Sequence, residues 1–197
     1  MIDAFNAING YDSFHSKLLG YFKLSRWDAT DRVLVSWPGN YYRYALDNYS
    51  WGYCAFQDFP TSTLQKADIF LTTHTATVNR SSVTGYCFDI DKDNVWPEGT
   101  GQMIVAYQKA GNFSSADYYL AEIEKLLVKS NLYPTAYGIP YSSNFGTHYA
   151  NAPLWQGADT KPCVSSDAWY LFGVLQFDPM AVNYNKAIPL ADKFWVN

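Results

Sequence analysis

The sequence has few charged residues and few cysteines, and it lacks a long apolar run. Charged side chains make up 16% of the 197 residues and the net charge is −4, so no Lys/Arg stripe exists to meet nucleic-acid phosphates. No apolar segment approaches the length of a membrane span. We therefore predict neither a nucleic-acid nor a membrane partner.

The three cysteines, Cys54, Cys87 and Cys163, are widely spaced. They form no metal-binding motif and no even disulfide framework. Cys54 is predicted to be a small core residue. Cys87 and Cys163 are either free thiols, the favoured interpretation, or a disulfide in an oxidising compartment.

The first residues lack the basic and apolar regions of a signal peptide. The localisation is left open between a cytoplasmic protein and a chain whose leader has been trimmed.

Aromatic residues are abundant, at 18%, and include 17 Tyr and 7 Trp. Tyr and Trp combine an apolar face with a polar group, so they suit sugar-binding grooves, although they also fill cores and interfaces. Hydrophobic residues make up 48%, which excludes a disordered chain. The length predicts one domain, residues 1–197.

The segment Asn94–Tyr107 organises the chain. A polar, acidic loop gives way at Pro97 to an apolar helix that Gly111 ends. Glu98 is placed at the start of this buried helix, where the helix dipole favours its ionised form. It is either a catalytic carboxylate or an N-terminal cap.

The same arrangement recurs around Asp47 and Ser165. Aligned on Asp47, Glu98 and Ser165, each copy has a small residue three places later and a large one after that: Ser50-Trp51, Gly101-Gln102 and Ala168-Trp169. The copies start 98 − 47 = 51 and 165 − 98 = 67 positions apart. Such irregular spacing predicts helical hairpins with long loops of variable length.

The hydrophobic pattern predicts antiparallel helices that alternate with short and long connections. The expected helices are 11–22, 42–56, 62–73, 99–110, 114–129 and 166–176. The long loops, 76–95 and 131–164, lead into the buried helices and should share one face. That face is the predicted site, and the second loop has room for one or two short strands.

Three motifs resemble the six-hairpin glycosidase superfamily, whose members are (α/α)6 toroids. They are Trp-x-Glu-Gly-Thr-x-Gln-Met at 96–103, Gly-x-Pro-Tyr at 138–141 and Ser-x-x-Ala-Trp-Tyr-x-Phe at 165–172. They occur in the order seen in bacterial proteins of this type, toward the C-terminus. The resemblance implies an all-α fold that forms about half of a toroid, because the chain has room for about three hairpins. It also implies a secreted or periplasmic location if a leader was trimmed.

The resemblance and the carboxylates together predict carbohydrate processing, most simply glycoside hydrolysis by an acid and a base or nucleophile. Glu98 and Asp47 are the catalytic candidates, with Asp167 and Asp89 in reserve. The predicted substrate-binding residues are Trp96, Tyr141, His148, Trp155, Gln102 and Asp167. His148 is otherwise a solvated loop residue, and Trp51 and Trp169 are expected in the core.

Asp89, Asp91 and Asp93 alternate as in a calcium-binding loop. However, Thr100 stands where an EF-hand needs a bidentate Glu. Turn-forming aspartates are the simpler interpretation, so no cofactor or metal is predicted, with calcium as the weaker alternative.

The alternative function is a non-catalytic glycan-binding or assembly module. In either case poly- or oligosaccharide is the expected partner. A half-toroid leaves apolar flanks on its terminal helices, and large apolar patches are rarely exposed on a monomer. A homodimer, a missing N-terminal half or a folded-back tail would cover them, and association is the expected solution.

Overall fold

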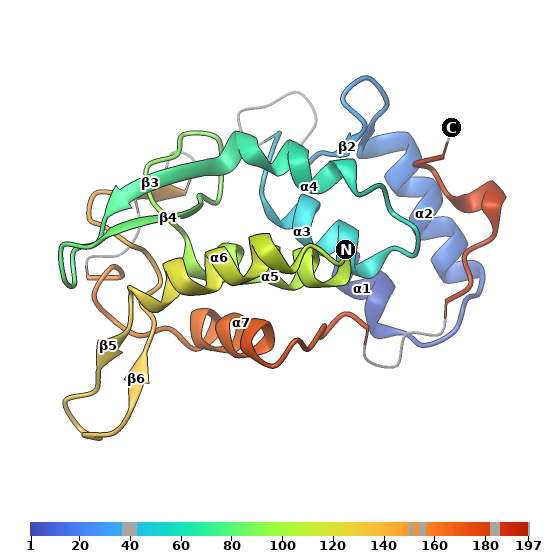
Figure 1. Cartoon of the computed structure of the whole chain (residues 1–197). Helices are drawn as coiled ribbons and strands as arrows, with labels where there is room; N and C mark the ends of the chain where they lie inside the picture. Colours follow the sequence, from blue (N-terminus) through green and yellow to red (C-terminus); the bar gives the residue numbers. More distant parts are fainter. Residues whose placement is uncertain (37–42, 150–151, 154–156, 182–185, 197) are drawn as a thin grey trace.

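Helix α5 (Pro97–Lys109) lies at the centre of the molecule (Figure 1). Pro97 occupies its first position, where the missing N–H costs no hydrogen bond. Every residue from Gly99 to Tyr107 is buried, so the helix is covered on all sides. The elements packed against it are α3 (Asp47–Ala55), α6 (Phe113–Glu124), α7 (Val164–Val174) and strand β4 (Ser82–Tyr86).

The computed structural model describes residues 1–36, 43–149, 152–153, 157–181 and 186–196. Of these residues 42% are helical and 13% belong to four small antiparallel strand pairs. The predicted all-α class is therefore wrong, and the chain has a mixed α/β structure instead of half an α-toroid. None of the helices in these ranges has both the length and the hydropathy needed to cross a membrane.

The main departure from the predicted helices is the hairpin of β3 (Leu71–Thr75) and β4. The predicted helix 62–73 stops early: α4 (Ser62–Lys66) passes into a 3-10 turn, η1 (Ala67–Phe70), and then into β3. The β-branched threonines of β3 favour a pleated strand. Thr73 and Thr84 face each other across the ladder with their hydroxyl oxygens 2.9 Å apart. The predicted loop 76–95 therefore contains a strand.

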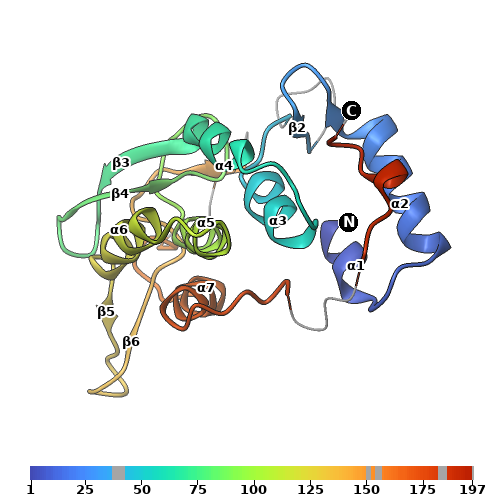
Figure 2. The ribbon, with the colours of Figure 1, turned by 45° about the vertical axis from the view of Figure 1, so that its right-hand side comes forward.

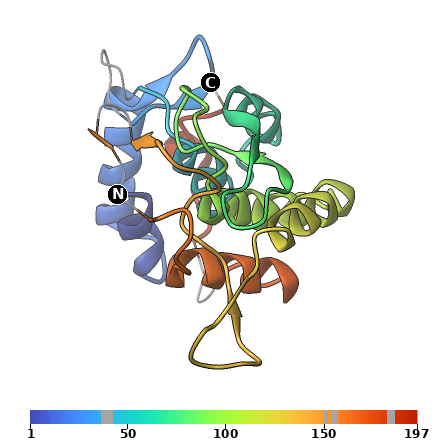
Figure 3. The ribbon, with the colours of Figure 1, turned by 90° about the vertical axis from the view of Figure 1, so that its left-hand side faces the viewer.

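The other strand pairs are two residues long in each strand. They are β1 (Trp27–Asp28) with β2 (Val33–Leu34), β5 (Val128–Lys129) with β6 (Tyr137–Gly138), and β7 (His148–Tyr149) with β8 (Ala152–Pro153). The expected helix 114–129 ends at Glu124, before β5. The β5–β6 hairpin projects from the body on the side of α7 (Figures 1 and 3). The loop 131–164 contains the short strands β6, β7 and β8, where the sequence predicts one or two.

The two chain ends form a layer on the far side of α3 from α5 (Figure 2). It consists of α1 (Ile2–Ala7), α2 (Ser13–Ser25) and the tail with its 3-10 turn, η2 (Leu190–Asp192). Trp195 is 1% exposed, stacks on Phe56 at 5.4 Å and donates its indole N–H to the Asp58 carbonyl at 3.1 Å. The tail thus folds back over the apolar flank. Association with a second copy or a missing half stays a prediction.

Candidate functional site

The first turns of α3, α5 and α7 bring Asp47, Glu98 and Ser165 to the same end of the helical layer. Asp47 is the first residue of α3, and Glu98 and Ser165 are the second residues of α5 and α7. The Ser165 hydroxyl donates to Glu98 Oε2 at 2.6 Å. The charge of Glu98 also acts on Asp47. The three positions of the sequence repeat therefore lie together in space.

Small residues allow these helices to approach closely. A Cβ atom at Gly101 would lie 2.7 Å from the Cβ of Trp169 and 3.0 Å from its backbone carbon. Toward α3, the Ser50 hydroxyl donates to Gln102 Oε1 at 2.8 Å. The small residue of the repeat thus packs against α7 in one copy and forms a buried hydrogen bond in another.

Asp47 sits in an environment that favours its protonated form. Its Oδ1 atom is fully covered, and no group in the described part of the chain donates a hydrogen bond to it. The pKa of Asp47 is raised to about 7, first by burial and then by the charges of Glu98 and Asp3, while the amide of Gln102 acts to lower it. Gln102 is 1% exposed, and its Nε2 likewise makes no hydrogen bond within the described ranges.

Glu98 has a different environment from Asp47. Burial raises the pKa of Glu98, but the hydroxyl of Ser165 acts against the shift because it donates to the carboxylate. Trp96 is the N-cap residue of α5, and no side chain among the described residues caps this helix. The carboxylate of Glu98 points to the neighbouring helix, so the capping interpretation of Glu98 is wrong.

The aromatic residues predicted to bind sugar fall into different environments. Trp96 is 4% exposed, with its ring against Phe88 at 5.0 Å and Tyr141 at 6.5 Å. Its face is covered, which does not fit a stacking role. Tyr141 is half-buried, and burial followed by the charge of Glu98 raises its pKa to about 12. Trp155 lies outside the described residues.

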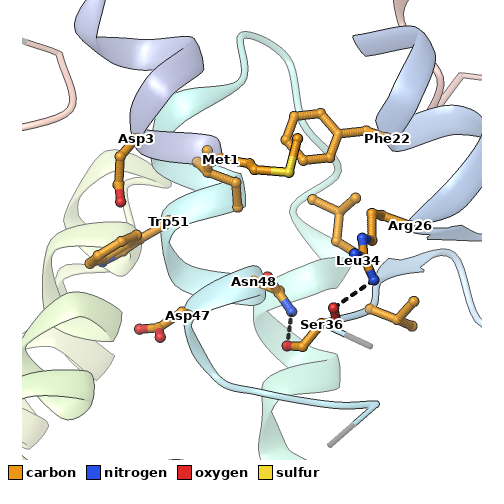
Figure 4. A pocket seen from close by; sticks show the side chains of 11 residues that line it. Met1, Asp3, Phe22, Arg26, Leu34, Ser36, Asp47, Asn48 and Trp51 are labelled. Carbon is orange, nitrogen blue, oxygen red and sulfur yellow. Dashed lines mark hydrogen bonds between the residues drawn. The ribbon is translucent and has the colours of Figure 1, made fainter. Parts of the chain in front are cut away.

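A cavity of about 270 Å³ adjoins Asp47 between α1, β2 and α3. Asp3, Trp51 and Asp47 line one side of it, and Arg26 and Ser36 line the other (Figure 4). Arg26 donates to the Tyr21 hydroxyl and to the Ser36 carbonyl, both at 2.8 Å.

Trp51 is the residue of this cavity that the sequence could have identified. It was expected in the core, yet it is half-buried and lines the cavity. Because it follows Asp47 by four positions, helical periodicity alone places both on one face of α3. Arg26 and Asp3 carry no comparable signal, since they come from segments that only the tertiary fold brings here.

Two other predicted site residues contact different groups. Asp167 accepts a hydrogen bond from the Ile139 backbone N–H at 2.7 Å, and burial raises its pKa. It thereby anchors the segment that leads to Tyr141. His148 is exposed on β7, and its backbone N–H donates to Asp93 Oδ2 at 2.6 Å.

The loop between β4 and α5 holds a group that could bind a metal ion: Cys87, Asp91 and Asp93, whose ligand atoms all lie within 4.8 Å of one another. All three cysteines are free, so the disulfide alternative is wrong. The calcium alternative named Asp89 in place of Cys87. Asp89 is 4% exposed, and its Oδ1 accepts the Asp91 backbone N–H at 3.3 Å.

Comparison with protein-family models, curated proteins and solved structures found no match to this chain. The resemblance to six-hairpin glycosidases therefore stays a prediction that rests on the three sequence motifs.

Proposed function

We propose that the chain processes carbohydrate by glycoside hydrolysis with Asp47 and Glu98, which lie in the first turns of α3 and α5 at one end of the helical layer. The observation that carries this proposal is the pair of half-buried carboxyls in unlike environments. Enzymes that cleave glycosidic bonds need one carboxyl that keeps its proton and another that is ionised. Burial raises the pKa of both groups, but that of Asp47 reaches about 7, whereas the Ser165 hydroxyl that donates to Glu98 opposes the rise there.

Asp47 is the proposed general acid and Glu98 the proposed base or nucleophile. Asp47 holds its proton up to about pH 7, so it can protonate the leaving oxygen. Glu98 receives a hydrogen bond from Ser165, which stabilises the carboxylate needed to activate water or attack the sugar. Gln102 also acts on Asp47, and its Nε2, which has no hydrogen-bond partner within the described ranges, can donate to that carboxyl.

Sugar as the substrate class is supported by the motif resemblance and by the aromatic residues of the site. Trp51 and Tyr141 are half-buried and stand beside the carboxyls, so each offers part of a ring to a sugar face. Since Trp96 is covered, they replace it as the proposed contacts.

The alternative is a glycan-binding or assembly module without catalysis. The cavity favours this reading, because about 270 Å³ lies just below the usual range of ligand sites and suits a single sugar ring better than a polymer. Pairing with a second copy or with a further domain would extend the surface. Light scattering tests that association.

A reducing-sugar assay on a panel of plant and bacterial polysaccharides tests the proposal. We expect turnover by the unmodified chain and its loss in Asp47→Asn and Glu98→Gln, with Asp117→Asn on the exposed face of α6 as the control. Calorimetric binding of oligosaccharide without turnover would favour the binding module. Turnover that survives both substitutions would reject these roles.

A calcium ion at Asp89, Asp91 and Asp93 is the weaker alternative that the sequence leaves open for the acidic loop. Calcium prefers six to eight oxygen ligands and does not need a thiol. Equilibrium dialysis against Ca²⁺ tests it: binding that survives Cys87→Ser but is lost in Asp89→Asn would support calcium. Binding that depends on Cys87 would contradict it.

A further inference from the structure

The thiol of Cys87 faces more acceptor atoms than its single proton can serve. The sulfur is fully buried and lies 3.1 Å from Asn94 Oδ1, 3.6 Å from Asp91 Oδ1 and 3.9 Å from Asp93 Oδ1. A thiol donates one weak hydrogen bond. The thiol proton can therefore serve only one of these three oxygens, and the other two lie near the sulfur without it. Such convergence of electron-rich atoms is what a bound cation would stabilise.

Two residues from a distant segment hold the oxygens in this orientation. Asn94 Nδ2 donates to Ser142 Oγ at 2.9 Å, which turns Asn94 Oδ1 toward the sulfur. The His148 backbone N–H donates to Asp93 Oδ2 at 2.6 Å, and its ring Nδ1 lies 3.3 Å from the same atom. Asp93 Oδ1 is thereby left facing Cys87. Metal ligands are commonly oriented by such outer hydrogen bonds.

We propose that Cys87, Asp91 and Asp93 bind a zinc ion, with Asn94 Oδ1 facing the fourth position and His148 and Ser142 orienting the ligands. A thiolate combined with carboxylates suits a borderline-soft cation, whereas calcium prefers oxygen ligands alone. Tetrahedral zinc with bonds of about 2.3 Å to sulfur and about 2.0–2.2 Å to oxygen places sulfur and oxygen about 3.5 Å apart. The observed separations from Asp91 and Asp93 are close to that value.

The ion would join the two segments that border the carboxyl site. Residues 93–95 and 142–144 already exchange hydrogen bonds, among them Ser143 N–H to the Val95 carbonyl at 3.0 Å and Asn144 Nδ2 to the Asp93 carbonyl at 2.9 Å. The first segment leads into α5 and Glu98, and the second follows Tyr141. The inferred role of zinc is to fix the position of these segments, and it is independent of the proposed hydrolysis.

Titration of the chelator-treated full chain with Zn²⁺, Ca²⁺ and Mn²⁺ by calorimetry tests the site. We expect one Zn²⁺ per chain, bound far more tightly than Ca²⁺ or Mn²⁺. Co²⁺ should give a thiolate-to-metal charge-transfer band that Cys87→Ser removes and Cys163→Ser keeps. Because Cys163 is also a free thiol but lies outside the cluster, it is the matched control.

Two further variants keep the test decisive if Cys87→Ser does not fold. Asp91 is exposed, so Asp91→Asn should leave the fold intact and weaken Zn²⁺ binding by at least about 100-fold, more than an orienting residue. Ser142→Ala should weaken it by about 10–100-fold. Unchanged Zn²⁺ affinity in Asp91→Asn, a cobalt band that persists without Cys87, or preferential Ca²⁺ binding would overturn the proposal. None of these measurements depends on hydrolytic activity.

Discussion

The site of Asp47 and Glu98 and the loop site of Cys87, Asp91 and Asp93 use carboxyl groups in opposite ways. Yet Cys87 and Glu98 are only 98 − 87 = 11 positions apart in the chain. At the start of α3, Asp47 Oδ1 is buried and receives no hydrogen bond within the described chain. In the β4–α5 loop, Asp91 and Asp93 accept backbone N–H groups from Asp93 and His148 and stand beside a thiol. The first environment retains a proton, and the second presents lone pairs to a cation.

The difference shows that burial and neighbouring groups determine whether a carboxyl group retains a proton or is available to a cation. Helix first turns place Asp47 and Glu98 against neighbouring helices, where burial dominates. A turn-rich loop exposes Asp91, whose carboxylate accepts the Asp93 backbone N–H. Substitutions at the two sites should therefore respond to different variables: pH at the first and metal ions at the second.

The largest expected effect is that of Asp47→Asn on the pH dependence of stability. The folded chain holds this proton up to about pH 7, while the ordinary pKa is 3.8, so the unmodified protein loses stability as the pH rises through that window. One pKa unit corresponds to about 1.4 kcal/mol, so after allowance for partial exposure we expect a loss of about 2–4 kcal/mol that the variant lacks. Urea denaturation across this pH range measures it. Parallel profiles for the two proteins would refute the raised pKa.

The next effect concerns the packing that holds the first site together. Gly101→Ala places a methyl group 2.7 Å from the Cβ of Trp169, so we expect a loss of about 1–3 kcal/mol from overpacking. Gly20→Ala in α2 is the control, because nothing lies within 4 Å of its added Cβ. It should be neutral or gain about 0.5–1 kcal/mol. Equal unfolding midpoints for the two variants would contradict close packing of α5 on α7.

Ser165→Ala should change the titration of Glu98. Removing the donor to the carboxylate raises the pKa of Glu98 further, and stability should fall by about 1 kcal/mol. A group whose pKa is raised in the folded state destabilises the protein as the pH rises through that pKa. The variant should therefore be less stable than the unmodified protein by a larger amount above the pKa of Glu98 than below it. Carboxyl-carbon NMR of labelled glutamate measures the shift. Ser114→Ala on the exposed start of α6 should leave the titration unchanged.

His148→Ala should have the smallest effect on the metal-free protein. Its ring is exposed beside Asp93, and such surface pairs contribute about 0–1 kcal/mol. In the presence of Zn²⁺ the variant should bind about 10–100-fold more weakly if the ring helps to hold Asp93. His74→Ala is the control, since its ring contacts the Lys92 carbonyl in the same loop at 2.7 Å. Equal zinc affinities would exclude a role for the His148 ring.

Part of this architecture could be predicted because local signals agree with one another. Pro97 and the buried run behind it predict α5, and the alignment of Asp47, Glu98 and Ser165 predicts three helices that begin alike. Their convergence is consistent with the apolar character that the three helices share. The same reasoning assigned 62–73 to one helix, because its apolar spacing fits both periods. The second half of this segment forms β3 instead, because its threonines favour a strand and β4 pairs with it.

The sequence by itself indicated that three buried helices start near Asp47, Glu98 and Ser165, because propensity and periodicity are local properties. Only the tertiary structure decided that Trp96 is covered while Trp51 lines a cavity, since burial depends on which distant segment packs against a side chain. It also decided that the tail seals the flank with Trp195 and that residues 142–148 orient the loop around Cys87. Those contacts join positions far apart in the chain, and their energies arise only when the whole chain has folded.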